Sequence, residues 1–243
     1  MKITFIGTSH GVPEANRKCT CVMLTVGGKH YIIDAGVMLC AELRARSVDL
    51  NDIKAVFLTH MHGDHTDGIV EFTDLLTWYF KDVRPAIYVP EIKAFEGVAA
   101  WLEVTHGQDM RAHMPEYTEV KEGAFYDDGN VKVTAIRTRH LKDRPSYGYM
   151  VEAEGKRVVF SGDMGLENYA DFPAAAYTLP CDVVVTEAAH FHLAKSVETF
   201  KKLTTKKLIV SHVVPWNEPE AEKLAEMVDY EVVLAYDGMT LEV

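Results

Sequence analysis

Four side chains that commonly bind metal ions stand close together in the first half of the chain. His60, His62, Asp64 and His65 follow directly after a short apolar run. In a loop of this kind, side chains two positions apart can converge on one ion, while the adjacent Asp64 and His65 can reach a second. Imidazole suits zinc, iron or manganese, and carboxylates suit the harder ions. The alternative, a polar turn with solvated histidines, is disfavoured by this density of ligand types.

Further ligand types stand at the ends of apolar segments later in the chain. His140 follows one such segment, Asp163 follows the run ending at Phe160, and His212 follows Leu208–Val210. Sites in layered α/β proteins gather at the carboxyl ends of strands. Taken singly, each of these residues is more often structural than a ligand. Together they would complete the ligand sets of two ions. His140 would bind the first ion, His212 the second, and Asp163 would bridge them.

Strands and helices alternate along the chain. Short apolar runs bounded by turn residues predict strands at Ile3–Ile6, Thr20–Val26, Tyr31–Ile33, Ala55–Leu58, Pro85–Val89, Val131–Ile136, Tyr147–Glu152, Arg157–Phe160, Val183–Thr186, Leu208–Val210 and Val232–Ala235. Longer segments predict helices at Val37–Arg46, Ile69–Phe80, Glu91–Val104, Val197–Leu203 and Pro219–Val228, the last with Asn217 as its N-cap. Two runs of strands, each followed by helices, predict two packed sheets with helices outside, within one domain over residues 1–243.

The composition is that of a globular protein with a large core, with 48% hydrophobic and 25% charged residues. The net charge of −11 makes the surface as a whole repel a nucleic-acid backbone. Metal cations would nevertheless dominate the field around a small phosphorylated substrate. The N-terminal segment is too short and polar for a signal peptide, and no apolar run approaches the roughly 20 residues that span a bilayer. We therefore expect a cytoplasmic protein without a membrane partner.

At these residues the chain resembles the metallo-β-lactamase superfamily, whose HxHxDH signature appears at 60–65. Other segments that carry the resemblance are Gly7-Thr8, Asp34-Ala35-Gly36, Ser161-Gly162-Asp163, Ser211-His212 and Ala235-Tyr236-Asp237. The resemblance implies a four-layer αββα sandwich with two divalent metal ions at one edge of the sheets, zinc first, with manganese or iron as alternatives. It assigns His60, His62 and His140 to one ion, Asp64, His65 and His212 to the other, and Asp163 to both.

Several segments are similar to the ribonuclease Z and small phosphodiesterase branch of that superfamily. They are Gly11-Val12-Pro13, Arg17, Pro145–Tyr149 and Thr186–His190. The segment before His140 is not the Thr-Pro-Gly-His run of thioesterases and lactonases, and Asp163 replaces the cysteine of true β-lactamases. Only 22 residues lie between His140 and Asp163, which leaves no room for the long arm with which ribonuclease Z grips transfer RNA. With the acidic charge, this leads us not to expect transfer RNA as a substrate.

The resulting hypothesis is a metal-dependent hydrolase, and most specifically a phosphodiesterase acting on a small phosphodiester or a cyclic nucleotide. A hydroxide shared by the two ions would attack phosphorus. Asp64 and His190 are the expected catalytic residues, with His190 as the general acid, Glu187 orienting it and His192 as the alternative. The rivals are a lactone, thioester or sulfate-ester hydrolase with the same centre, or a non-catalytic metal-binding protein. A homodimer is compatible with the sequence.

Four other positions permit two interpretations each. Asp34 is expected to orient a ligating histidine rather than to bind metal. Arg144 is expected to be an exposed charge rather than a phosphate clamp. His10 either lines the site or is solvated. The aromatic residues of Trp78–Phe80 either pack in the core or form the floor of a pocket.

Overall fold

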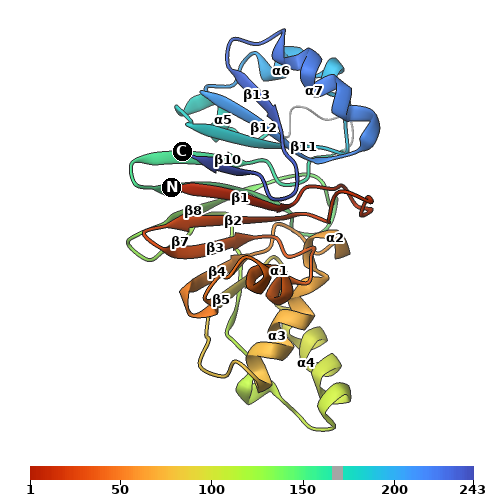
Figure 1. Ribbon diagram of the computed structural model, residues 1–243, viewed down its shortest axis with the longest axis vertical. Coiled ribbons are helices and arrows are strands. Elements are labelled where there is room, and N and C mark those ends of the chain that lie inside the picture. The colour runs from red at the N-terminus through yellow and green to blue at the C-terminus, as the bar shows by residue number, and fades with distance from the viewer. Residues whose placement is uncertain (166–171) are drawn as a thin grey trace.

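Two mixed β-sheets lie face to face at the centre of the molecule (Figure 1). The computed structural model describes residues 1–165 and 172–243. In these residues the first sheet has the strand order β14-β1-β2-β3-β4-β5-β6. Its strands are β1 (Lys2–Gly7), β2 (Cys21–Val26), β3 (Lys29–Ile33), β4 (Ile53–Phe57), β5 (Ala86–Val89), β6 (Tyr117–Glu119) and β14 (Thr240–Glu242).

The second sheet has the strand order β13-β12-β11-β10-β9-β8-β7. Its strands are β7 (Gly123–Asp127), β8 (Lys132–Arg137), β9 (Tyr147–Ala153), β10 (Lys156–Phe160), β11 (Val183–Ala188), β12 (Lys207–Val213) and β13 (Glu231–Leu234). Strands β10 to β13 run parallel, and β7 to β10 pair antiparallel. The parallel strands therefore all end at the same edge of the sheet.

Helices cover the outer face of each sheet (Figure 1). The helices are α1 (Leu39–Ala45), α2 (Gly63–Thr66), α3 (Gly68–Trp78), α4 (Lys93–His106), α5 (Ala175–Thr178), α6 (Val197–Phe200) and α7 (Glu218–Ala225), with 3-10 turns at Leu50–Asp52, Arg111–His113, Leu193–Lys195 and Pro215–Asn217. Helices α1 and α3 pack on the first sheet, and α5 to α7 pack on the second. The predicted αββα sandwich is confirmed.

The strands are apolar on both faces because each sheet is buried on both sides. In β2, Val22 and Leu24 enter the core between the sheets, while Cys21 and Met23 enter the core beneath the helices. Tyr149 of β9 crosses the central core, and its hydroxyl donates a hydrogen bond of 2.6 Å to Leu58 O. This hydrogen bond links the two sheets immediately after the end of β4.

Some elements differ from those expected. Strands β6, β7 and β14 were not predicted because each is short or half-exposed and lacks a clear apolar alternation. Helix α6 ends at Phe200 rather than Leu203, since Thr204 turns back to donate its N–H to Ala176 O. Helix α7 spans Glu218–Ala225, shorter than the expected Pro219–Val228 at its carboxyl end.

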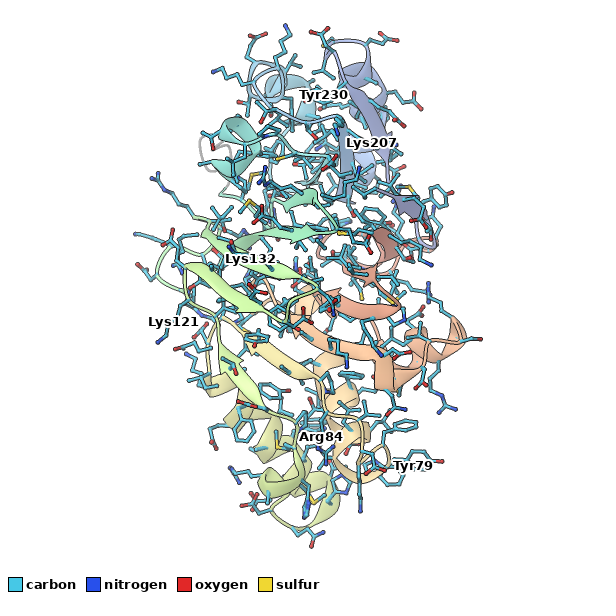
Figure 2. The ribbon with its side chains drawn as sticks, turned by 90° about the vertical axis from the view of Figure 1, so that its left-hand side faces the viewer. Tyr79, Arg84, Lys121, Lys132, Lys207 and Tyr230 are labelled. Carbon is cyan, nitrogen blue, oxygen red and sulfur yellow. The ribbon has the colours of Figure 1, made fainter. Side chains whose placement is uncertain are left out.

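The end of α3 is an outer corner of the molecule. Figure 2 shows Tyr79 and Arg84 at the end opposite Tyr230 and Lys207. Trp78 is 45% exposed and Tyr79 is 62% exposed, whereas Phe80 is half-buried against the α1–α3 core. Among the helices of the described residues, none has the length and apolar character needed to cross a bilayer.

Candidate metal centre

The first ligand loop begins where β4 ends, and it rests on the loop that follows β3. Ala35 N–H donates to His65 O at 2.7 Å, and Gly68 N–H donates to Ala35 O at 2.8 Å. A Cβ atom at Gly36 would lie 1.8 Å from Asp64 O, and one at Gly68 would lie 1.6 Å from Val37 O. Only glycine permits this close contact between the two backbones, so the Asp-Ala-Gly segment fixes the position of Asp64 and His65.

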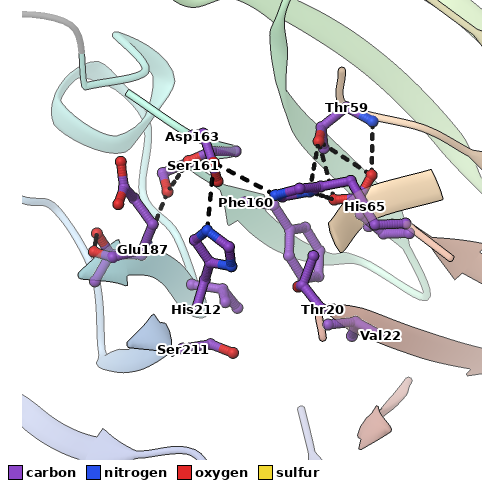
Figure 3. Close-up of a pocket in the computed structure, with 15 residues that line it drawn as sticks. Thr20, Val22, Thr59, His65, Phe160, Ser161, Asp163, Glu187, Ser211 and His212 are labelled. Atoms are coloured by element: carbon purple, nitrogen blue, oxygen red, sulfur yellow. Dashed lines mark hydrogen bonds and ion pairs between the residues drawn. The ribbon is translucent and has the colours of Figure 1, made fainter. Parts of the chain in front are cut away.

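Asp34 fixes the orientation of one histidine within this loop. Its buried carboxylate accepts hydrogen bonds from Thr59 N–H at 2.8 Å, from the Thr59 hydroxyl at 2.9 Å and from His65 Nδ1 at 2.8 Å (Figure 3). Nδ1 of His65 therefore carries a proton, and its Nε2 is free to face the cluster. The structure thus contains the orienting contact expected of Asp34.

The second sheet contributes its side chains from four strand ends. His140 follows β8, Asp163 follows β10, His190 follows β11 and His212 is the penultimate residue of β12. His212 Nδ1 donates to Ser9 O at 2.9 Å, and His140 Nδ1 donates to Met164 O at 3.3 Å. Like Asp34 on His65, these main-chain acceptors hold Nδ1 and leave Nε2 directed into the cluster.

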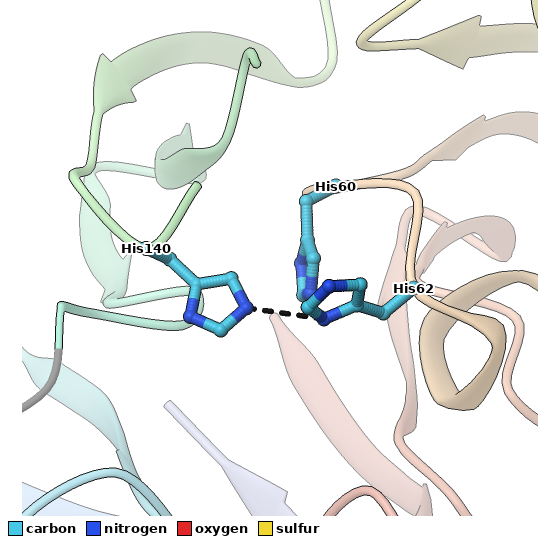
Figure 4. A group of neighbouring side chains, drawn as sticks. All are labelled: His60, His62 and His140. Carbon is cyan, nitrogen blue, oxygen red and sulfur yellow. Dashed lines mark hydrogen bonds between the residues drawn. The ribbon is translucent and has the colours of Figure 1, made fainter. Parts of the chain in front are cut away.

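All seven predicted ligands come together at this edge. The ligand atoms of each group lie within 4.8 Å of one another, and the groups among the described residues are His60, His62 and His140; Asp64, His65 and His212; His60, His65 and Asp163; and His140, Asp163 and His190. Figure 4 shows the first group, in which His62 Nδ1 and His140 Nε2 are 3.1 Å apart. Two of these groups have the membership that the superfamily resemblance implied for the two ions, and the other two join residues across that division. Metal binding by these residues stays a prediction.

Asp163 adjoins both groups, and Figure 3 shows it beside His65 and His212 of the second group. Its Oδ2 atom is 3.3 Å from Nε2 of both His65 and His212, and 3.7 Å from Nε2 of His60. Burial would raise the pKa of this carboxyl group, but the neighbouring imidazoles, His212 and His65 foremost, hold the pKa well below its usual value. A buried anion shared by the two groups is the expected partner for two cations.

The donor atoms fit transition-metal ions. Nε2 of His60 and Nε2 of His65 are buried and make no hydrogen bond within the described part of the chain. Burial and the neighbouring His65 lower the pKa of His60 well below its usual value, which favours the neutral imidazole that a metal binds. Unpaired buried nitrogens are costly unless another group satisfies them, and a divalent ion at each of the two donor groups would satisfy them.

His190 borders the cluster and is held by Glu187. Its Nδ1 is 2.9 Å from Glu187 Oε1 and 3.8 Å from Asp163 Oδ2. Burial opposes protonation, but the hydrogen bond and charge of Glu187, with Asp163, raise the pKa of His190 to about 9. His192 lies elsewhere, since it is 46% exposed and packs on Trp216 with ring centres 4.5 Å apart. The geometry therefore favours His190 over His192 as a group that acts on a substrate.

Asn217 is a contributor that the sequence did not reveal. It stands at the expected N-cap position of α7, but its side chain caps nothing there. The fully buried side chain instead donates to Ala188 O at 2.8 Å and Phe191 O at 2.7 Å, and it accepts from Leu193 N–H at 3.2 Å. Asn217 thus closes the loop that carries His190.

Two expected candidates lie in ion pairs of their own. Arg144 Nη2 is 2.6 Å from Glu91 Oε1, which agrees with an exposed charge rather than a free phosphate clamp. His10 Nε2 is 3.1 Å from Glu14 Oε1.

Two ligand-bearing or ligand-orienting residues have left-handed backbone conformations. The φ angle is +60° at Asp34 and +47° at His212. Non-glycine residues adopt this region at an energetic cost, which the packing around them must outweigh, and Ser47 and Glu154 also adopt it. No sequence pattern signals this feature, because it arises only when the loops are packed together.

Comparison with known proteins now places the chain. A family model described as "Anti-Pycsar protein Apyc1" matches residues 1–228. The chain belongs to the Apyc1 family. Among curated relatives, a Ribonuclease Z from Mycobacterium sp. (strain KMS) is 30% identical over 177 residues, which cover 67% of this chain and 61% of the relative. A Ribonuclease Z from Mycolicibacterium gilvum is 25% identical over 252 residues, covering 91% of this chain and 87% of the relative.

Solved structures share the fold of this Apyc1-family chain. The metallo-β-lactamase fold protein YhfI from Bacillus subtilis has a TM-score of 0.77 at 16% identity, covering 100% of this chain and 99% of its own. The short form of human tRNase Z has a TM-score of 0.72 at 20% identity, covering 100% and 99%. A diphosphatase of the PhnP family scores 0.71 at 19%, covering 100% and 97%. The predicted superfamily and branch are confirmed.

The expectation about transfer RNA was wrong. Relatives named Ribonuclease Z and the fold shared with a tRNase Z overturn it. The net charge of −11 is a sum over the whole molecule, whereas phosphate contacts depend on the local field at the site. The short segment between His140 and Asp163 is likewise only one connection in the fold, and its length says nothing about other surfaces that an RNA could contact.

The cluster predicts close to two transition-metal ions per chain. Replacing Asp163 by Ala should empty at least one position, because this carboxylate alone adjoins both groups among the described residues. Elemental analysis of the purified protein after metal reconstitution measures the ratio. Asp229→Ala, at an exposed position, is the control. A wild-type ratio of one or less, or an Asp163→Ala ratio equal to the wild type, would contradict the assignment.

We expect loss of the hydrogen bonds donated by the Asn217 side chain to lower the stability of the protein without changing its metal content. Asn217→Asp cannot donate to the two carbonyl oxygens, so we expect the free energy of unfolding to fall by about 2–3 kcal/mol. Urea denaturation measures the change, with Asn16→Asp as an exposed control. Equal stability of the two variants would show that the loop does not depend on these bonds.

Proposed function

We propose that this protein is a metal-dependent phosphodiesterase that acts on a small phosphodiester or a cyclic nucleotide. The proposal rests chiefly on one arrangement, in which His190, held by Glu187, stands beside both donor groups and the carboxylate of Asp163. The ring centres of His190 and His140 are 4.6 Å apart, and those of His190 and His212 are 6.1 Å apart. A phosphate seated on the donor cluster would therefore have a proton-donating group at its side.

Divalent cations held by the seven donors would supply a hydroxide near neutral pH and would offset negative charge on the phosphate oxygens. Asp64 contributes one carboxylate oxygen to this set, 3.3 Å from His65 Nε2. Zn²⁺ is the first candidate because the donors are mostly imidazoles, and Mn²⁺ and Fe²⁺ are the alternatives. A Zn²⁺-bound protein of the same fold, PqqB from Methylobacterium extorquens, supports this choice (TM-score 0.70 at 15% identity, covering 100% of both chains).

The acid role of His190 follows from its two nitrogens. Glu187 accepts a hydrogen bond from Nδ1, so the proton on Nε2 is the one available to a leaving oxygen. The same carboxylate accepts hydrogen bonds from the N–H groups of Met164 and Ala189. Glu187 therefore holds the imidazole in one orientation, and it stabilises the imidazolium before the proton is given up.

The relatives support phosphorus–oxygen chemistry over carbonyl chemistry. Their names include Ribonuclease Z, tRNase Z and a diphosphatase, all of which describe reactions at phosphorus. A lactone, thioester or sulfate-ester hydrolase with the same donors is the rival function. Such an enzyme gains less from an acid at the position of His190 when its leaving group departs readily as an anion, as a thiolate does. RNA belongs among the substrates to be tested because of the relatives named Ribonuclease Z.

The substrate class can be tested with one panel at a fixed metal loading. We expect bis(p-nitrophenyl) phosphate or a cyclic nucleotide to be hydrolysed with a kcat/KM well above that of lactones, thioesters and sulfate esters. Precursor transfer RNA is included as a further phosphodiester. Chelation should abolish the activity, and added Zn²⁺ or Mn²⁺ should restore it. Faster lactone or thioester hydrolysis would exclude the phosphodiesterase assignment.

Replacing His190 by Ala separates proton donation from binding. Metal content should stay unchanged, and kcat should fall by roughly 10²–10⁴-fold for a poor alkoxide leaving group. The loss should be smaller for p-nitrophenolate, which needs no proton to depart. His192→Ala is the matched control, since that imidazole packs on Trp216 outside the cluster. An equal loss for both leaving groups would assign His190 a packing role, and loss of metal would make it a ligand or a ligand support.

A further inference from the structure

A hollow adjoins the donor cluster at Asp64. It has a volume of about 450 Å³ and lies between the segment 11–19, the start of α1 and the first ligand loop. Its apolar lining comes from Pro13, Val37 and Met38, and its acidic lining includes Asp64 and Asp67. Met38 is 57% exposed although its neighbour Val37 is buried in the α1–α3 core. An apolar side chain is therefore presented at the mouth of this hollow.

Asp64 belongs both to the lining of the hollow and to the donor cluster. This residue lines the hollow, and its Oδ2 atom is also 3.3 Å from His65 Nε2 and 3.8 Å from His212 Nε2. Gly11 lies next to the same carboxylate, and a Cβ added at Gly11 would be 3.8 Å from Oδ2. No side chain from Gly11 enters the space between the hollow and the cluster. A group bound in the hollow would thus lie directly beside whatever the cluster holds.

The two sides of the cluster differ in what they offer a substrate. His190 groups with His140 and Asp163, whereas Asp64 groups with His65 and His212. A leaving group protonated by His190 would therefore depart on the side of His140. The hollow beside Asp64 remains for a substituent that stays bonded to phosphorus.

The charges in the hollow indicate what that substituent is. Glu42 is paired with Lys18 at 2.6 Å and with Arg46, and the buried Arg17 is paired with Glu218 at 3.0 Å. These pairs neutralise both cations that line the hollow, and Asp67 and Glu14 add carboxylates, while Asp64 belongs to the metal donors. A second anionic group would therefore find no free cation among these lining side chains. An uncharged flat ring could pack on the thioether of Met38, which adapts well to aromatic surfaces.

We propose that this hollow binds the substituent retained on phosphorus, and that it selects an uncharged planar ring, such as an aryl group or a nucleobase. The proposal rests on the proposed function, since it assigns a place to one part of a phosphodiester. It predicts a preference that depends on the retained group and not on the leaving group. His190 should show the opposite dependence.

The test uses the metal-reconstituted protein and two substrates that share a p-nitrophenolate leaving group. One retains a phenyl ester and the other a methyl ester. We expect Met38→Asp to lower the ratio of kcat/KM for phenyl over methyl on the order of tenfold, and Met38→Leu to restore it. Met227→Asp, at an exposed methionine elsewhere, is the control and should keep the wild-type ratio. Circular dichroism and metal analysis verify that each variant is folded and loaded.

A binding measurement keeps the proposal independent of turnover. Titration calorimetry with the monoanions methyl phenylphosphonate and methyl methylphosphonate, in which the ring or the methyl group is held by a P–C bond that hydrolysis does not break, should show tighter binding of the phenyl compound, and Met38→Asp should remove the difference. An unchanged ratio in Met38→Asp, or an equal loss in Met227→Asp, would overturn the subsite. Phenyl selectivity in binding without any turnover would overturn the proposed function and leave the subsite standing.

Discussion

The site depends on one buried carboxylate around which imidazoles from both sheets converge. Asp163 Oδ2 lies within 3.8 Å of a nitrogen of five described histidines, which are His60, His65, His140, His190 and His212. The first two follow β4 of the first sheet, His140 and His190 follow strands of the second sheet, and His212 lies near the end of β12 in that sheet. Neither sheet could assemble this cluster alone. The donor set therefore exists only when the sheets are packed in one relative position. The hydrogen bond from the Tyr149 hydroxyl to Leu58 O links the two sheets just before the first ligand loop, and so helps to hold them in that position.

A second set of contacts holds the loop after β1 at the same edge. Buried Arg17 donates to the Thr8 hydroxyl at 2.7 Å and to Ala235 O at 2.6 Å, while Thr8 donates to Asp237 Oδ1 at 2.8 Å. Ser9 O accepts a hydrogen bond from His212 Nδ1, so the position of this loop directly affects the orientation of one imidazole in the donor cluster. A buried guanidinium whose donors are satisfied this way specifies one arrangement of the loop, because any other would leave a buried charge without partners.

The sequence was most informative where function depends on residues close together or on strand ends. The ligand loop at 60–65 and the positions of His140, Asp163 and His212 could be read because spacing and apolar runs are local. The role of Asn217 could not, since its partners at 188–193 lie more than twenty positions away and its own surroundings resemble an ordinary helix cap. The statement about transfer RNA failed for a related reason, because net charge and one loop length carry no information about surfaces formed by distant segments.

The left-handed backbone at Asp34 and His212 places a conformational cost within the loops that build the donor cluster. Glycine at either position would relax the φ angle of +60° or +47° without steric cost. It would also delete the carboxylate that orients His65 or an imidazole of the cluster. Glycine there would exchange the cost of the left-handed backbone for buried groups left without hydrogen-bond partners. The geometry of the donor edge and the stability of the loops that form it are therefore tied together at these two residues.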